Sequence, residues 1–258
     1  MIATDKYMSA PIVARTDHAP TLWSIRIKTP DPLPFRAGQY VAFGLLNGEK
    51  VLERAFSIAS SPYEEELEFF IERVADGALS PQLYQLQVGD RVQMRRKAKG
   101  VFNLDHKSGH KQHFLVSTVT GIAPYISYVR TMMRDLEQGR LEEPFRLVIL
   151  QGSSRSDEFG YDEELRCCAR TASWLTYIPT VSRPWEDPGW AGERGRVDDL
   201  VRKYTDTMRL DPETTTAYLC GNPGMIVNAR DILRRRGFKT ESIKEETYWA
   251  PGEGEVEY

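Results

Sequence analysis

Cysteine is scarce in this chain, with three in 258 residues. Cys167 and Cys168 are neighbours, which seldom bridge each other, and the odd count leaves one thiol over. A disulfide framework is therefore not expected, and the chain by itself cannot hold a plant-type iron–sulfur cluster, which needs four cysteines. This cysteine usage favours a reducing compartment, so we expect a cytoplasmic protein.

Long apolar runs and an excess of one charge are also missing. No stretch is long enough for a membrane span, and residues 1–17 lack the basic start and apolar stretch of a signal peptide. Thirty-four Lys and Arg residues nearly balance 37 Asp and Glu residues, for a net charge of −3. That balance argues against a nucleic-acid binder driven by bulk positive charge. The composition, 41% hydrophobic and 28% charged, is that of a soluble globular protein.

The first hundred residues have the pattern of β-structure. Trp23, Ile25 and Ile27 alternate with polar side chains until Pro30-Asp31-Pro32 ends the run. We expect further strands at 38–43, 54–59, 67–74 and 91–95, and a short helix at 80–86. Several short strands at this spacing predict a closed antiparallel β-barrel.

From about residue 109 onward, strands alternate with helices. We expect strands at 113–117, 146–150, 174–181 and 217–220, and helices at 122–136, 157–170, 197–203 and 225–236. This order predicts βαβ units on a parallel sheet, the second half of a two-domain protein. The boundary is expected between Leu104 and Lys111, which gives domains at 1–106 and 107–258. Open α/β sheets bind ligands beyond the carboxyl ends of their strands, and a barrel against that edge would form a cleft.

Two motifs of the first half can bind a flat, phosphorylated cofactor. Arg54-Ala55-Phe56-Ser57 places a phosphate-clamping guanidinium, a stacking ring and a hydroxyl on one strand. Taken alone, the tetrapeptide favours an ordinary strand, because four such positions recur by chance. Gly77-Ala78-Leu79-Ser80 precedes the short helix and offers free backbone amides to a phosphate. The plainer interpretation makes Ser80 an N-cap with Pro81 at the first helical position.

Two segments of the second half follow strands at the ligand-binding edge. Ser117–Pro124 has the position of a phosphate loop but lacks the glycines of a dinucleotide fingerprint. Cys220–Met225 follows the last expected strand, where a lone cysteine is more often a buried apolar filler than a reactive group. Adjacent aromatics, Tyr248 and Trp249, lie near the C-terminus and can plug a groove or cover a flat cofactor.

Taken in this order, the motifs resemble the ferredoxin–NADP reductase family in its bacterial branch, over nearly the whole chain. The family's FAD-binding Arg-x-Tyr-Ser reads Arg54-Ala55-Phe56-Ser57 here, so Phe56 keeps the ring and loses a hydroxyl. Its Thr-Gly-Thr-Gly reads Thr118-Val119-Thr120-Gly121, so Val119 replaces a glycine. The Cys-Gly-Asn-Pro segment matches closely. Members with the Tyr-Trp ending usually stop there, whereas Ala250–Tyr258 follow here with three glutamates.

The resemblance implies FAD on the barrel and NADPH on the α/β domain, with no metal. It implies catalytic roles for Ser57, Cys220 and Glu246. The FAD-binding residues it implies are Arg54, Ala55, Phe56, Ser57, Phe70, Ile71, Glu72, Arg73, Val74, Gly77, Ala78, Leu79, Ser80, Thr120, Tyr248 and Trp249. The NADP-binding residues are Thr120, Gly121, Ser153, Ser154, Arg155, Ser182, Arg183, Arg196, Cys220, Gly221, Asn222, Pro223 and Gly224.

In such a protein, arginines that follow strands of the α/β half bind the 2′-phosphate, which favours NADPH over NADH. The first arginine of the family aligns with Ser154, so Arg155 is shifted by one. Solvated loop charges are the common alternative for all three arginines.

The basic run Arg95-Arg96-Lys97-Ala98-Lys99 is either a solvated strand end or a landing patch for an acidic ferredoxin or flavodoxin. We expect hydride transfer from NADPH to FAD, then release of single electrons to that partner, in a monomer without nucleic acid or membrane. A flavin reductase or an oxygenase-partner reductase on the same scaffold is the nearest alternative. A non-catalytic flavin-binding regulatory subunit, or an α/β domain for another nucleotide beside an unrelated barrel, is more distant.

Overall fold

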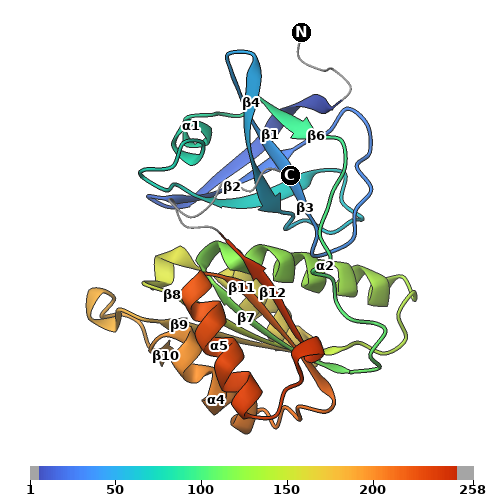
Figure 1. Cartoon of the computed structure of the whole chain (residues 1–258), viewed down its shortest axis with the longest axis vertical. Coiled ribbons are helices and arrows are strands. Elements are labelled where there is room, and N and C mark those ends of the chain that lie inside the picture. The colour runs from blue at the N-terminus through green and yellow to red at the C-terminus, as the bar shows by residue number, and fades with distance from the viewer. Residues whose placement is uncertain (1–5, 249–258) are drawn as a thin grey trace. The chain divides into compact units, whose positions relative to one another are not determined.

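The computed structural model of the chain describes residues 6–248, which fall into two compact units (Figure 1). Unit 1 combines the residues up to Leu104 with Ala123–Glu142. Unit 2 combines Asp105–Ile122 with the residues from Glu143 onward. Within residues 6–248, no helix is long and apolar enough to cross a membrane.

Unit 1 is built on a six-stranded antiparallel sheet in the order β4-β3-β6-β1-β2-β5. Its strands are β1 (Tyr7–Ala19), β2 (Leu22–Ile27), β3 (Tyr40–Asn47), β4 (Lys50–Ser57), β5 (Leu67–Glu72) and β6 (Arg91–Arg95). Trp23, Phe43 and Phe69 are fully buried in its core. The outer strands approach each other just beyond β4, where the Ala59 amide donates to the Glu68 carbonyl at 2.8 Å.

The longest strand, β1, lies outside the strands expected from the sequence. Met8, Ala10 and Ile12 alternate into the core in the manner of a strand, but Pro11 stands among them. A proline lacks the amide that a ladder needs and usually marks an edge. β1 pairs with β2 mainly beyond Pro11 and with β6 over Tyr7–Pro11, so the missing amide is tolerated inside the sheet.

Unit 2 is built on a six-stranded parallel sheet in the order β10-β9-β8-β7-β11-β12. Its strands are β7 (Gln112–Thr118), β8 (Arg146–Ser153), β9 (Leu175–Val181), β10 (Glu193–Arg194), β11 (Thr215–Gly221) and β12 (Ile243–Thr247). An antiparallel first sheet followed by a parallel α/β unit confirms the predicted fold class. β12 was not predicted, because Ile243–Thr247 carries four polar residues in five and has no alternation to detect.

Helices α4 (Val197–Thr207) and α5 (Pro223–Arg235) pack beside each other on one face of the parallel sheet (Figure 1). Alternate strand residues form that face, among them Phe114, Val116 and Leu219. Helix α3 (Asp162–Thr171) packs on β9 and begins five residues later than expected, because Ser156–Glu158 form a separate 3₁₀ turn. Chain order reverses between β7 and β11, so the sheet has its topological switch point there.

Helix α2 (Ala123–Glu137) follows β7 in the chain but belongs to unit 1 by its contacts. The Tyr128 hydroxyl donates to the Phe102 carbonyl, and the Tyr125 ring stacks on Phe102 at 6.2 Å between centroids. Gly38 has a φ of +90°, and a Cβ there would lie 1.9 Å from the Phe102 carbonyl oxygen. The expected domains, 1–106 and 107–258, place α2 in the second domain, whereas its contacts group it with unit 1. The two functional domains with these bounds stay a prediction.

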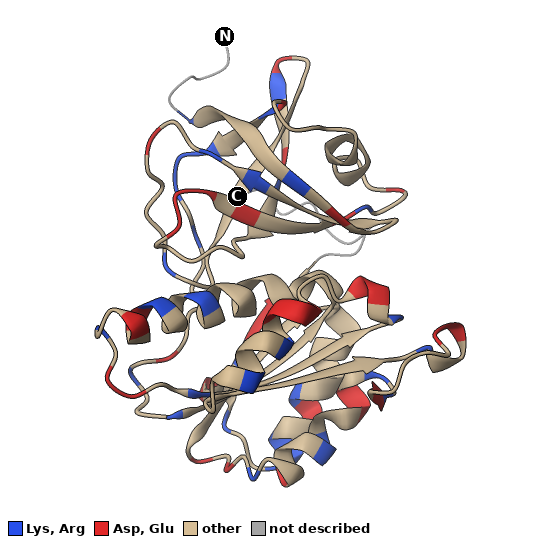
Figure 2. Cartoon of the chain, turned by 180° about the vertical axis from the view of Figure 1, so that it is seen from behind, with Lys and Arg blue, Asp and Glu red and all other residues tan. Residues whose placement is uncertain are grey.

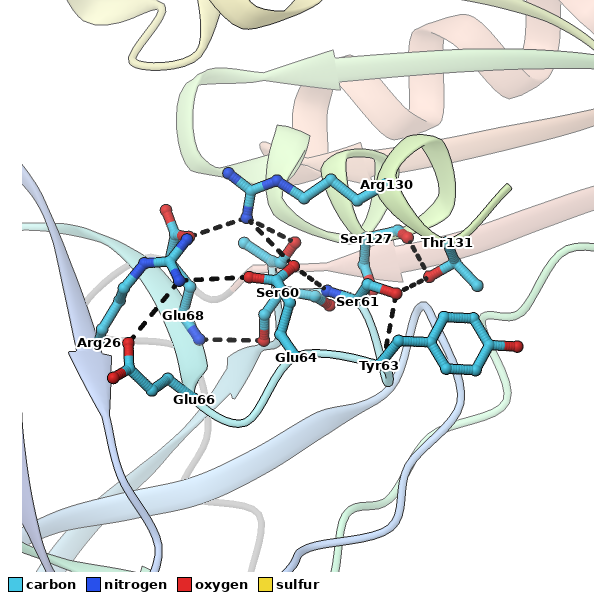
Figure 3. Close-up of polar contacts among 11 residues, drawn as sticks. Arg26, Ser60, Ser61, Tyr63, Glu64, Glu66, Glu68, Ser127, Arg130 and Thr131 are labelled. Atoms are coloured by element: carbon cyan, nitrogen blue, oxygen red, sulfur yellow. Dashed lines mark hydrogen bonds and ion pairs between the residues drawn. The ribbon is translucent and has the colours of Figure 1, made fainter. Parts of the chain in front are cut away.

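A buried carboxylate ties α2 to the antiparallel sheet (Figure 3). Glu68 on β5 is 5% exposed, and its Oε2 accepts hydrogen bonds from Arg26 Nη2 at 2.6 Å and from Arg130 Nη1 at 2.8 Å. One turn earlier on α2, the Ser127 hydroxyl donates to the Ser60 carbonyl at 2.7 Å. Because Arg26 lies on β2 and Arg130 on α2, Glu68 holds three elements with one side chain.

One fully buried histidine lies in unit 2. His113 on β7 has no hydrogen-bond partner for either ring nitrogen within residues 6–248 and packs edge-on against Phe145 at 4.9 Å. Burial lowers the pKa of His113 to about 3, because the charged form is poorly solvated there.

We expect Glu68→Gln to lower the free energy of unfolding by about 2 kcal/mol, since it leaves two half-buried arginines without their shared carboxylate. Urea denaturation of wild type and variant measures this. The control is Glu65→Gln, whose carboxylate is 87% exposed and 3.6 Å from Lys28, and which should change stability by less than about 0.5 kcal/mol. Equal losses for the two variants would contradict the role assigned to Glu68.

We expect acid to destabilise unit 2 through His113. Below pH 6.5 the unfolded chain binds a proton at this ring, whereas the folded chain binds it only near pH 3, so folding loses up to about 1.4 kcal/mol per pH unit across that window. His113→Leu lacks this loss. We measure the free energy of unfolding of both proteins at pH 7.5, 6, 5 and 4. The value for the variant minus the value for wild type should increase as the pH falls. Parallel pH profiles would refute the assignment.

Candidate functional site

The Arg54–Ser57 motif occupies the end of β4. Phe56 packs its ring on the buried Phe43 ring, with 4.4 Å between centroids, and Phe43 pairs across the ladder with Arg54. Arg54 and Phe56 therefore share one face of β4, as the alternation predicts. The Arg54 guanidinium is exposed, donates to the neighbouring Glu53 carbonyl at 2.9 Å and forms no ion pair within residues 6–248. Ser57 is buried at the end of the strand.

The strand after this motif presents mostly buried side chains. Ile71 belongs to the core of unit 1, and Phe70 is 4% exposed with its ring against His18 at 5.3 Å. Glu72 is exposed, and Arg73 lies over the Tyr84 ring at 4.7 Å. A flat ligand along Phe70–Val74 would consequently meet backbone groups and few free side chains.

The Gly77–Ser80 segment corrects one expectation. Helix α1 (Ser80–Tyr84) begins at Ser80 and ends two residues earlier than expected. Ser80 is not the N-cap, because its hydroxyl accepts the Val74 amide at 3.0 Å and closes the preceding loop. Among the residues described, the amides of Ala78 and Leu79 donate to no acceptor. They are available to an anion.

In unit 2, the turn after β7 packs tightly against the end of β11. The Thr118 hydroxyl accepts the Asn222 amide at 2.9 Å. A Cβ on Gly121 would lie 2.4 Å from the Cys220 carbonyl oxygen, and one on Gly221, at φ +119°, would lie 2.3 Å from Thr118 Oγ1. Both glycines are thus required by the contact between these two segments. The two segments flank the switch point of the sheet, where open α/β folds bind ligands.

Val119 stands where the family carries a glycine, and its backbone lies in the left-handed region. Its φ is +41°, which is strained for a β-branched residue. The Gln151 side chain supports the turn by donating to the Val119 carbonyl at 3.5 Å and the Phe159 carbonyl at 3.3 Å. Tyr177 in turn donates to Gln151 Oε1 at 2.8 Å. Thr120 is half-buried in the same turn, Val119–Ile122.

Four of the predicted residues meet at the carboxyl ends of β11 and β12. Cys220 pairs in register with Glu246, and Tyr248 donates its amide to the Gly221 carbonyl at 3.0 Å. Burial, and then the negative charge of Glu246, raise the pKa of the Cys220 thiol well above its usual range. Cys220 is therefore a neutral, packed thiol and not a thiolate nucleophile. Trp249 and Ala250–Tyr258 lie outside the described residues.

Helix α5 begins directly after Cys220 and Gly221. Asn222 is its N-cap and accepts the Met225 amide at 3.1 Å, with Pro223 at the first helical position. Gly224 is exposed in the first turn, and a Cβ there would approach only the Asn222 side chain. This helix start is open to a phosphate, which helix N-termini favour.

The three predicted arginines all follow strands of unit 2. The loops that carry two of them are joined by backbone bonds, from Ser182 to Ser153 at 2.9 Å and from Arg183 to Ser154 at 3.1 Å. Arg155 and Arg183 both contact Glu186. Arg196 pairs instead with Asp198, at 3.3 Å, and remains 61% exposed.

The residues present fit the two nucleotides that the resemblance implies. On unit 1, an exposed guanidinium, two free amides and an aromatic ring match a flavin with a pyrophosphate. On unit 2, a turn and a helix start meet at the switch point, and one arginine follows each of the strands β8, β9 and β10. Sequence reasoning placed Thr118 in a motif without assigning it a role, and it missed the supporting residues Gln151, Tyr177 and Glu186. No sequence pattern marks Gln151 or Tyr177, because the first contacts Val119 and the second contacts Gln151, both far apart in the chain. Glu186 contacts Arg183 three residues before it, but its contact with Arg155 arises only from the fold.

Comparison with known proteins agrees with this division. The FAD-binding domain model of oxidoreductases matches residues 12–102, and the oxidoreductase NAD-binding domain model matches residues 115–231. A flavodoxin/ferredoxin–NADP reductase of Rhodobacter capsulatus is 32% identical over 235 residues, covering 85% of this chain and 82% of the relative. The reductase component of phenol 2-monooxygenase from Pseudomonas sp. strain CF600 is 31% identical over 249 residues, covering 95% of this chain and 67% of the relative.

The fold has a close solved counterpart. A ferredoxin NADP+ reductase from Neisseria gonorrhoeae, solved with bound FAD and NADP, superposes with a TM-score of 0.81 at 24% identity and covers 94% of this chain and 98% of its own. The two domain models follow each other in the same order as the two units, and the Rhodobacter relative matches most of both chains. The protein therefore belongs to the ferredoxin–NADP reductase family of flavin-dependent oxidoreductases.

Proposed function

We propose that this protein carries electrons between NADPH and a ferredoxin or flavodoxin, with residues 1–106 holding FAD and residues 107–258 holding NADPH. The observation that carries the proposal is that one chain has both features. Arg54, which forms no ion pair within residues 6–248, shares a face of β4 with Phe56, and the parallel sheet has a topological switch point of the kind that binds nucleotides. Bound FAD would supply hydride acceptance and one-electron release. The cysteine usage favours the cytoplasm, and we expect a monomer.

The residues of unit 1 bind and orient the flavin. Arg54 neutralises its pyrophosphate together with the amides of Ala78 and Leu79, Phe56 packs on its ring system, and the Ser57 hydroxyl hydrogen-bonds at its reactive edge. Residues Phe70–Val74 line it through their backbone. Because Phe56 is held by Phe43, the stacking surface is set before the cofactor arrives.

The residues of unit 2 bind and orient the pyridine nucleotide. The Thr120–Gly121 turn and the start of α5 at Asn222–Gly224 take its pyrophosphate. Arg155, Arg183 and Arg196, with the hydroxyls of Ser153, Ser154 and Ser182, take the 2′-phosphate. The neutral Cys220 thiol packs against the nicotinamide, and Glu246 passes protons. Tyr248 covers the isoalloxazine, and Trp249 touches the adenine.

The basic run supplies a docking surface for an acidic electron-transfer protein. Arg95 is committed to Glu53 and lies over the Tyr7 ring, so it stabilises the fold. Arg96, Lys97 and Lys99 are exposed, and Val101 beside them is 90% exposed. Arg96 reaches Asp31 at 3.8 Å, a solvated and therefore weak contact. Exposed cations around an exposed apolar residue suit a transient, charge-steered encounter.

An oxygenase-partner reductase is the second candidate, because one relative of similar identity is named as the reductase component of a monooxygenase. The two functions share the cofactors and differ in the electron acceptor. Electron transfer to an oxygenase component, with none to ferredoxin or flavodoxin, would select this second candidate.

The deciding experiment is an anaerobic titration of the purified protein with NADPH and, separately, NADH, following the visible flavin band. We expect bleaching at far lower NADPH than NADH. Arg183→Ala should raise the NADPH requirement about tenfold, because it removes a charge-assisted bond to the phosphate, and leave NADH unchanged. Arg170→Ala, in the last turn of α3, is the matched control. A colourless protein that takes up no FAD would refute the proposal.

We expect the triple change Arg96→Gln, Lys97→Gln and Lys99→Gln to slow reduction of an acidic ferredoxin roughly tenfold at low salt and to flatten the salt dependence. Stopped-flow kinetics measure both effects, and bleaching by NADPH should not change. Arg234→Gln with Arg235→Gln removes an exposed basic pair from α5 and serves as the control. Unchanged partner kinetics in the triple variant would remove the basic run from the docking surface.

A further inference from the structure

Carboxylates surround the arginines that follow β8 and β9. Arg155 contacts Asp157 at 3.3 Å through Nε, Glu158 at 3.1 Å through Nη2 and Glu186 at 3.9 Å through Nη1. Every nitrogen of this guanidinium therefore faces an acid. In Figure 2, acidic and basic segments lie together on the connection between β9 and β10. The arginines that are expected to bind the 2′-phosphate are therefore already in contact with carboxylates of the same loops.

Glu186 differs from the other acids because two arginines share it. Its carboxylate lies 3.6 Å from Arg183 and 3.9 Å from Arg155, so one anionic group is within ion-pair distance of both guanidinium groups. Glu158 also accepts the Ser154 amide at 2.8 Å, and Asp187 accepts the Ser156 amide at 2.9 Å, so both support the loops. The Glu186 side chain makes no hydrogen bond to backbone within the described chain and is 38% exposed.

The loop that carries Glu186 is held in place without its side chain. The Arg183 amide bonds to Ser154, the Glu186 amide bonds to the Arg183 carbonyl at 3.0 Å, and Asp187 fixes the far side. The carboxylate is thus kept near both arginines by the backbone, at a high local concentration. Its ion pairs are long and solvated, so each is weak and open to displacement.

We propose that Glu186 is a specificity-determining residue, an internal anion that competes with the nucleotide's 2′-phosphate for Arg155 and Arg183. This inference rests on the proposed function. A phosphate that enters must displace the carboxylate, whereas a nucleotide without the phosphate leaves it in place. Glu186 therefore lowers the preference for NADPH below the level that the arginines alone would set.

The test is calorimetric binding of 2′,5′-ADP and 5′-AMP, which differ by the 2′-phosphate, to the oxidised full-length holoprotein. We expect Glu186→Gln to tighten 2′,5′-ADP binding roughly threefold to tenfold and to change 5′-AMP binding by less than about twofold. Glu186→Asp keeps the charge and should stay near wild type. In an Arg183→Ala background the gain from Glu186→Gln should shrink, because the two side chains act as a pair.

Glu213→Gln is the matched control, since Glu213 forms an exposed ion pair with Lys239 at 2.6 Å elsewhere in unit 2. It should leave both nucleotides unchanged. An unchanged 2′,5′-ADP affinity in Glu186→Gln would overturn the inference. Weaker 5′-AMP binding in that variant would also overturn it, because Glu186 would then be an acceptor for the ribose hydroxyl. Equal binding of both nucleotides by wild type would instead overturn the NADPH assignment itself.

Discussion

The parallel direction of every strand in the second sheet constrains where this protein can bind a nucleotide. Because the strands run the same way, their carboxyl ends meet at one edge, and the chain order reverses between β7 and β11. Thr118–Gly121 and Cys220–Gly224 emerge on either side of that reversal. They fit against each other only because Gly121 and Gly221 carry no Cβ. Position in the sheet thus explains why these short segments bear the candidate site.

The antiparallel unit depends on a polar connection to a helix that the chain order places elsewhere. Glu68 holds Arg26 and Arg130, and Ser127 bonds to the Ser60 carbonyl, so α2 meets β2, β5 and the segment after β4 through oriented bonds. Such bonds demand one geometry, whereas apolar packing tolerates sliding. Since Ser60 follows Ser57 by three residues, the same connection steadies the end of the candidate flavin strand.

Charge in this protein has to be interpreted pair by pair. Arg95, within the basic run, is committed to Glu53, and Arg196 pairs with the buried Asp198, which also accepts an amide hydrogen of Asn228. Arg155 and Arg183 share Glu186. Arg54 forms no ion pair in the described part of the chain. A count of cations near a strand end therefore overstates the positive field that a phosphate would meet.

The sequence by itself determined the fold class, the family and the two nucleotides, because alternation, helical periodicity and short motifs are local properties of the chain. It placed the strands from β2 to β9 and β11 within a few residues. The tertiary structure alone decided that β1 continues through Pro11, that Ile243–Thr247 adds a strand to β11 and that α2 joins the first unit. It also decided which carboxylate each arginine meets. The strand pairings and the place of α2 depend on partners far apart in the chain, whose approach through space leaves no periodic signal in the residues themselves. Contacts such as that of Arg183 with Glu186 join near neighbours, but they depend on how the loop folds.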